Sequence, residues 1–160
     1  MGEAYQGVVL AAPFTVMPER RSDRSVPALM AMALKGVLDQ AGILPGELDG
    51  LSLASLTIAP DSVLGICDHL GLSCRYLDQP PMGGSSAIAA VRRAARMVMA
   101  GDVDHVAVIG ADRSDGTSFV DLVANFSRVS REAVWPYGAG GPNAVFALLT
   151  HHYMRAYGAT

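Results

Sequence analysis

Residues 79–113, QPPMGGSSAIAAVRRAARMVMAGDVDHVAVIGADR, decide the fold of this chain. The stretch begins with a glycine and serine turn, continues with the small residues of a helix, and ends in an almost continuously apolar strand, His105–Gly110. Such a strand suits a parallel sheet that helices cover. A helix that begins at Gly-Gly-Ser-Ser directs unpaired N–H groups outward, and these groups favour an anion or a developing oxyanion. The turn formed by Gly83, Gly84, Ser85 and Ser86 is therefore the predicted binding site.

Strand and helix patterns alternate through the part of the chain before this stretch. Short apolar runs predict strands at Gly7–Ala12, Leu51–Leu56 and Cys74–Leu77, the first of them buried on both faces. The polar flanks of the third run, with Arg75, suggest a sheet edge or an interface. Strands that alternate with helices imply right-handed βαβ units. The predicted fold class is α/β, with a mostly parallel sheet and helices on both faces.

The sequence between these predicted strands has the features of helices. Ser25 is a candidate N-cap, Pro27 suits a first turn, and Gly42 suits a C-cap. The apolar stripe between them has helical spacing, and it consists of Met30, Ala33, Leu34, Val37, Leu38 and Ala41. A second, shorter helix is expected over Asp61–Leu70.

The regular pattern stops at Asp112. Roughly thirty residues of mixed polarity follow, which is long for a simple connection and typical of a functional excursion or a subdomain. Pro142 then opens a helix that ends near Gly158. We therefore expect an α/β core over 1–112 and a second segment over 113–160 that closes with a helix.

Composition excludes several classes of partner. The 160 residues are 51% hydrophobic and 17% charged, with a net charge of −3. A pI near 5.7 argues against nucleic acid or an anionic membrane surface, both of which need a basic face. Neither a signal peptide nor an apolar run long enough to span a bilayer is apparent, so we expect a cytoplasmic protein.

The sequence indicates neither a metal nor a nucleotide cofactor. Cys67 and Cys74 do not have the C-x-x-C spacing, and they are expected to be small buried hydrophobic residues. Asp61, Asp68 and His69 match no compact ligand set. Neither a phosphate-loop lysine nor a GxGxxG turn after a strand is present.

Two groups of polar residues near the turn have two interpretations each. Ser85 and Ser86 could act as nucleophiles, but no His, Asp or Glu lies nearby in sequence to activate them, and capping the helix is the simpler role. The arginine cluster, Arg92, Arg93 and Arg96, occupies one helix face. It is either a solvated face or a contact for a ligand's phosphate group or an acidic partner.

The chain resembles the thiolase superfamily, in five matches that occur in the family's order. They are VVLAAPFTVMPER, DQAGILPGELDGL, the helix at Gly84, HVAVIGAD and GPNAVFALLTHHYMRAYGAT; the last is most similar to the sterol-carrier-protein-2 type. Counting back without gaps from Ala100 and Gly101, the family's nucleophilic cysteine falls on Gly84. A shift of one residue places Gly83 or Ser85 there, so neither register supplies a thiol. The resemblance implies no acyl-enzyme and no catalytic residue in this chain.

The resemblance covers only the N-terminal half of a thiolase and part of its inserted loop region, to which 113–160 corresponds. The fifth strand of that half and the whole second half, with its acid and base motifs, have no counterpart here. His151 and His152 lie on a different element from those motifs. An incomplete sheet implies an exposed apolar surface and a partner, and by analogy CRYLDQ (74–79) is the seam of a dimer.

The resemblance implies a function that requires the other half of a thiolase fold. Some thiolase-like proteins without the cysteine carry out retro-aldol cleavage of steroid-side-chain acyl-CoA thioesters, often beside a small zinc-ribbon partner. We therefore expect a subunit or fragment that binds an acyl-CoA thioester, in a homodimer or hetero-oligomer of the retro-aldol or acyltransferase type. The alternative is a non-catalytic scaffold subunit with the same fold, and the 160 residues could also be a truncation of a longer gene product.

Overall fold

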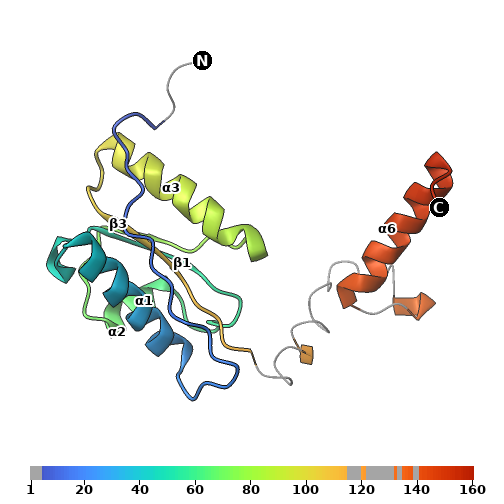
Figure 1. Ribbon diagram of the computed structural model, residues 1–160, viewed down its shortest axis with the longest axis horizontal. Coiled ribbons are helices and arrows are strands. Elements are labelled where there is room, and N and C mark those ends of the chain that lie inside the picture. Colours follow the sequence, from blue (N-terminus) through green and yellow to red (C-terminus); the bar gives the residue numbers. More distant parts are fainter. Residues whose placement is uncertain (1–4, 115–119, 122–131, 133–134, 139–140) are drawn as a thin grey trace. The chain divides into compact units, whose positions relative to one another are not determined.

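The computed structural model describes residues 5–114, 120–121, 132, 135–138 and 141–160 (Figure 1). The chain divides into two compact units, Met1–Arg113 and Ser114–Thr160, and each is described by itself. Most of the polar excursion expected after Asp112 lies outside the described residues. The assignment of the second unit to a thiolase loop region stays a prediction.

The first unit is built on a parallel sheet of three strands in the order β2-β1-β3. These strands are β1 (Gly50–Ala54), β2 (Tyr76–Asp78) and β3 (Val106–Gly110). Gly50 of β1 is in register with Tyr76 on one side and with Val106 on the other. The predicted parallel sheet is confirmed, and the run at Cys74–Leu77 does lead into an edge strand.

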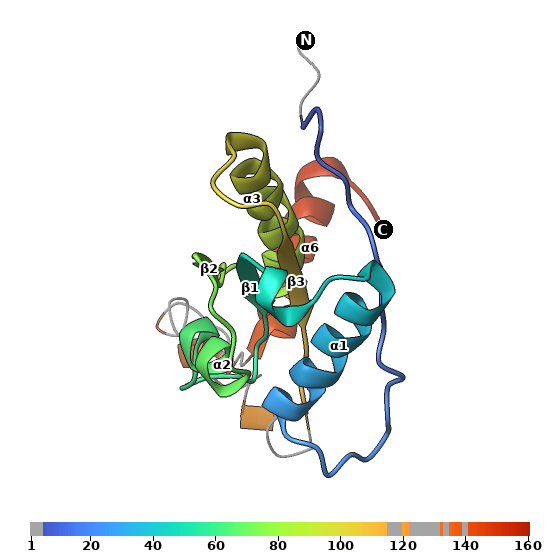
Figure 2. The same cartoon turned by 90° about the vertical axis from the view of Figure 1, so that its left-hand side faces the viewer.

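Three helices cover this sheet: α1 (Val26–Ala41), α2 (Val63–His69) and α3 (Ser86–Ala100). Both views show α3 on one face of the sheet and α1 with α2 on the other (Figures 1 and 2). The caps of α1 are as predicted, because the Ser25 hydroxyl accepts a hydrogen bond from the Ala28 N–H and Gly42 has a φ of +69°. Helices on both faces of a parallel sheet therefore form the α/β layers that the sequence predicted.

The core lies between β1 and the helices α1 and α2. Leu51 and Leu53 of β1 have no exposed surface, and they pack with Met30 and Leu34 of α1 and Ile66 of α2. A strand that is buried on both faces suits the central position in a parallel sheet. The apolar stripe of α1 is buried where it faces this strand, as its helical period indicated.

The segment Gly7–Ala12 was predicted to be a strand buried on both faces, and this prediction is wrong. The segment belongs to none of the three strands, and Val9 and Leu10 are 82% and 83% exposed. The apolar, β-branched composition is real, but a strand also needs a neighbour for its backbone hydrogen bonds. Within the described part of the chain, residues 9–12 have no such neighbour.

Asp49 fixes the amino-terminal edge of the sheet. Its carboxylate accepts hydrogen bonds from the N–H groups of Asp104 and His105, at 2.9 and 3.1 Å, and pairs with Arg75 at 2.7 Å. Its main-chain oxygen accepts from the N–H groups of Arg75 and Tyr76. One residue thus sets the start of all three strands. The Asp104 and His105 N–H groups and the Arg75 guanidinium lower the pKa of the Asp49 carboxyl to about 2.

This shift predicts a loss of stability in acid. The folded pKa lies below the unfolded value of about 3.9, so the contribution of the carboxylate is complete above that value and is lost as the pH falls to about 2. Asp49→Asn should lower the free energy of unfolding near neutral pH and flatten its decline across this acid window. Urea unfolding at a series of pH values measures both effects. Asp68→Asn, at an exposed position on α2, is the control and should follow the wild type; an unchanged pH profile for Asp49→Asn would contradict the assignment.

The second unit contains one long helix among its described residues, α6 (Gly141–Tyr157), preceded by a short turn at Trp135–Tyr137. The helix that Pro142 was predicted to open is confirmed. The rings of Tyr153 and Tyr157 pack against each other with centroids 4.8 Å apart. Across the described ranges, no helix is both long and apolar enough to cross a membrane.

Candidate functional site at the start of α3

The predicted turn forms a short 3₁₀ segment, η2 (Gly83–Ser85), that leads directly into α3. Gly83 has a φ of +57°, a conformation that glycine adopts without strain. Gly83 and Gly84 are exposed, and a side chain added at either residue would meet no atom within 4 Å. The N–H groups of these two glycines have no acceptor among the described residues. A ligand oxygen could therefore approach both of them.

The two serines of the turn differ from the glycines. The N–H of Ser85 donates to the Met82 carbonyl at 3.2 Å, and the N–H of Ser86 donates to the Gly83 carbonyl. Ser86 is buried, and its hydroxyl accepts a hydrogen bond from the Met82 N–H at 3.1 Å. Ser86 thus closes the turn, as the capping interpretation expects, and the exposed Ser85 lies at its surface. Of the four predicted residues, the two glycines offer free donors.

The carboxyl edge of the sheet is held by a second acidic residue that the sequence did not single out. One oxygen of Asp112, after β3, accepts hydrogen bonds from Ser55 Oγ at 2.8 Å and from the Leu56 N–H at 2.7 Å. The N–H and Oγ1 of Thr57 also donate to this oxygen, each at 2.9 Å. Asp112 therefore fixes the loop that follows β1. In parallel sheets, ligands bind at this carboxyl edge, and the chain from β2 to the glycine turn also leaves from it.

We expect the loop after β1 to lose its order when this carboxylate is removed. In Asp112→Ala, the Leu56 amide loses its acceptor and the Thr57 amide keeps only Ser55 Oγ at 3.2 Å, so both should exchange with solvent faster, the Leu56 amide by about tenfold. Hydrogen exchange followed by NMR measures this, with the Leu53 amide in β1 as the internal reference. Asp112→Asn keeps an acceptor oxygen and should retain part of the protection. Unchanged exchange at Leu56 and Thr57 in both variants would show that the loop is held by other contacts.

The arginine cluster is exposed on α3. Arg93 pairs with Asp78 of β2 at 3.0 Å, which ties the helix to the edge strand. Arg92 and Arg96 hydrogen bond to the Tyr5 hydroxyl and lower its pKa. One arginine thus has a structural partner, and the other two face the N-terminal segment, so a contact with CoA phosphate stays a prediction.

The thiols are free, as expected, with Cys67 buried and Cys74 partly buried. Burial and the neighbouring Cys67 raise the pKa of the Cys74 thiol to about 12, which disfavours the nucleophilic thiolate. Among the residues that the structure describes, no three His, Cys, Asp or Glu side chains gather in a way that could hold a metal ion.

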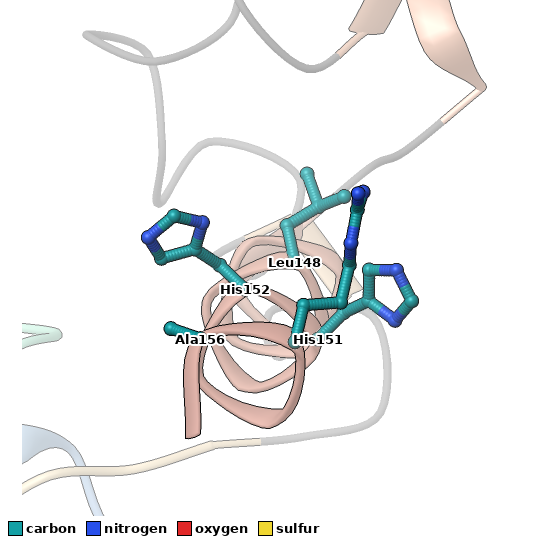
Figure 3. A pocket seen from close by; sticks show the side chains of 5 residues that line it. Leu148, His151, His152 and Ala156 are labelled. Atoms are coloured by element: carbon teal, nitrogen blue, oxygen red, sulfur yellow. The ribbon is translucent and has the colours of Figure 1, made fainter. Parts of the chain in front are cut away.

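A hollow on the second unit involves both histidines of α6. It is lined by Leu148, His151, His152, Arg155 and Ala156, all from this one helix (Figure 3). The rings of His151 and His152 point to different sides of the helix in this view. Both residues are exposed. This arrangement gives neither histidine an acid or base role.

The backbone of the glycine turn provides a direct test of its geometry. Gly83→Ala places a side chain at positive φ and should cost about 1 kcal/mol of unfolding free energy. Gly84→Ala has neither the positive φ nor a nearby atom and should change stability little. Urea denaturation of the two variants compares them directly. Equal stabilities would show that Gly83 does not hold the left-handed conformation.

Comparison with known proteins shows what class of fold this is. The chain superimposes on the structure titled Ltp2-ChsH2(DUF35) aldolase with a TM-score of 0.63 at 23% identity, over 87% of this chain and 35% of that one. It superimposes on the Xanthomonas campestris OleA with bound lauric acid and lauroyl-CoA with a TM-score of 0.53 at 20% identity, over 66% of this chain and 33% of that one. The fold is thiolase-like, and this chain has a part of it. No family model matches the chain.

A curated relative gives the comparison by sequence. The 17-hydroxy-3-oxo-4-pregnene-20-carboxyl-CoA lyase of Mycobacterium tuberculosis (strain ATCC 25618 / H37Rv) is 28% identical in an alignment 149 residues long, and the match covers 88% of this chain. The chain spans only 38% of the length of that lyase. The thiolase resemblance inferred from the sequence is therefore confirmed for the fold, including its partial extent.

Proposed function

We propose that this chain is the acyl-CoA-binding part of a thiolase-like assembly that breaks or forms a carbon–carbon bond next to a thioester. The free N–H groups of Gly83 and Gly84 carry the proposal. Free backbone donors at a helix start can stabilise an oxygen that becomes negative, as in an enolate or alkoxide. Such stabilisation needs no covalent acyl-enzyme, and this agrees with a glycine where thiolases have their cysteine.

The names of two similar proteins support this type of reaction. One is a lyase named for a carboxyl-CoA substrate, and another is an aldolase. In the retro-aldol cleavage of a 3-hydroxyacyl thioester, a base takes the hydroxyl proton, and the electron pair of the broken Cα–Cβ bond moves onto the thioester oxygen as an enolate, which is the charge that paired amides stabilise. Retro-aldol cleavage is therefore the proposed reaction type. The thioester oxygen would lie on the Gly83 and Gly84 amides, and the acid or base would come from outside this chain.

The proposed assembly has more than one chain or segment. The aldolase neighbour is titled with a DUF35 partner, which supports a hetero-oligomer here. The edge strand β2 pairs only with β1 in the described sheet, so its outer side is open for the dimer seam proposed at 74–79. Both contacts are parts of the proposal.

A binding experiment tests the role of the glycine amides. Gly84→Val puts a branched side chain over the turn without meeting another part of the protein, and it should weaken binding of octanoyl-CoA about tenfold, or 1.4 kcal/mol. The thioether analogue, which lacks the carbonyl oxygen, should bind wild type and variant equally. Isothermal titration calorimetry measures each affinity.

The chain offers a matched control. Gly46 occupies the middle of another 3₁₀ turn, Pro45–Glu47, and is equally open. Gly46→Val should bind octanoyl-CoA like the wild type. If wild type binds the thioester no better than the thioether, the amides have no role in recognition. Wild-type protein that binds neither ligand but still forms its oligomer would favour the alternative, a non-catalytic scaffold subunit.

A further inference from the structure

The hydrogen bonds of the glycine turn, residues 80–86, are local. The Met82 N–H donates to the Pro80 carbonyl at 3.0 Å and to Ser86 Oγ at 3.1 Å. Among the described residues, no hydrogen bond joins 80–85 to the sheet or to a helix other than α3. The place of the turn relative to the sheet therefore depends on packing and on the residues that flank it.

Asp78 comes just before this segment, at the carboxyl end of β2. Its side chain is 14% exposed, and a carboxylate with so little contact with water requires polar partners. One oxygen accepts a hydrogen bond from the Ser52 hydroxyl of β1 at 3.4 Å, and the other pairs with Arg93 of α3 at 3.0 Å. The Asp78 carboxylate thus joins two strands to the helix that follows the turn.

Arg93 lies about two turns after Ser86, the first residue of α3. A helix transmits the position of one residue to the others, because its backbone hydrogen bonds make it stiff. The pair with Asp78 therefore fixes the start of α3 against the end of β2, with the glycine turn between them. The Arg93 side chain is 49% exposed, so the pair contributes little to global stability, and its main effect is on position.

Gln79 holds the same segment from the opposite face of the sheet. Its Oε1 accepts a hydrogen bond at 2.8 Å from the N–H of Val63, the first residue of α2. Successive residues of an extended chain point to opposite faces, and α2 and α3 lie on opposite faces of this sheet (Figures 1 and 2). The chain that enters the turn is therefore held by α3 through Asp78 and by α2 through Gln79.

We infer that Asp78 and Arg93 are positioning residues for the glycine turn. Their ion pair sets the place at which the Gly83 and Gly84 amides meet a ligand oxygen, although neither side chain contacts that oxygen. The inference rests on the proposed function for its link to thioester recognition. The position of the turn, however, can be measured without any ligand.

Two variants break the pair. Arg93→Gln changes a half-exposed residue and should leave the fold intact, and Asp78→Asn keeps the shape of the side chain but removes its charge. In both variants the Ser86 N–H, which donates to the Gly83 carbonyl, should exchange with solvent about fivefold faster, while exchange of the Leu53 amide in β1 is unchanged. Hydrogen exchange followed by NMR measures both amides.

Arg92→Gln is the matched control on the same helix. Arg92 is also exposed, and in the described part of the chain it forms no ion pair with an acidic side chain. The control makes the same change of charge at the neighbouring position and should leave exchange at Ser86 as in the wild type. Unchanged exchange in Arg93→Gln and Asp78→Asn, or equal acceleration in Arg92→Gln, would overturn the inference.

Ligand recognition separates positioning from a purely structural role. A loss of stability alone would weaken binding of octanoyl-CoA and of its thioether analogue alike, whereas a displaced turn weakens binding of the thioester only. The ratio of the two affinities should therefore fall about threefold in Arg93→Gln and in Asp78→Asn. Arg93→Lys keeps the charge and should retain most of the ratio, and isothermal titration calorimetry measures it in each variant.

This inference and the proposed function fail in different ways. Faster exchange at Ser86 in both variants, with a wild type that binds thioester and thioether equally, would sustain the placement of the turn by this pair and reject the proposed function. A wild type that prefers the thioester, and variants Arg93→Gln and Asp78→Asn that keep this preference in full, would sustain the proposed function and overturn the positioning role.

Discussion

The burial of β1 between two parallel neighbours is the constraint on which the rest of this protein depends. Leu51 and Leu53 have no contact with solvent, so the strand must be covered on both faces and paired on both edges. Asp49 sets the register at its start through hydrogen bonds to the residues that open β2 and β3. Because all three strands begin together, their carboxyl ends also meet at one edge.

The candidate site is a consequence of that common edge. The chain that leaves β2 turns through Gly83 and Gly84 into α3, and the loop that leaves β1 is held by Asp112 after β3. The fold therefore brings together segments that are far apart in sequence, using backbone donors and one carboxylate. The backbone N–H groups of Gly83 and Gly84 depend on the conformation of the turn and on no side chain.

The described sheet has two outer strands, β2 and β3, each of which pairs only with β1. The outer sides of these two strands are different kinds of edge. Apolar residues of α1 and α3 line a groove beside β3, whereas polar residues flank the other edge, with Arg75 directly before β2 and Asp78 at its end.

The sequence by itself determined the local elements: α1 with its Ser25 and Gly42 caps, the parallel strand at Val106–Gly110, and the glycine turn before α3. These depend on period, capping and glycine chemistry, which are properties of a few consecutive residues. The sequence alone also showed the resemblance to thiolases. Only the tertiary structure decided that, among the described residues, Gly7–Ala12 has no strand neighbour and Gly83 and Gly84 keep free amides, that Ser86 closes the turn, and that Asp112 holds the loop after β1. Each of these features depends on whether a backbone group finds a hydrogen-bond partner. The partner is either distant in sequence or placed by the path of the turn, so no local sequence pattern predicts it.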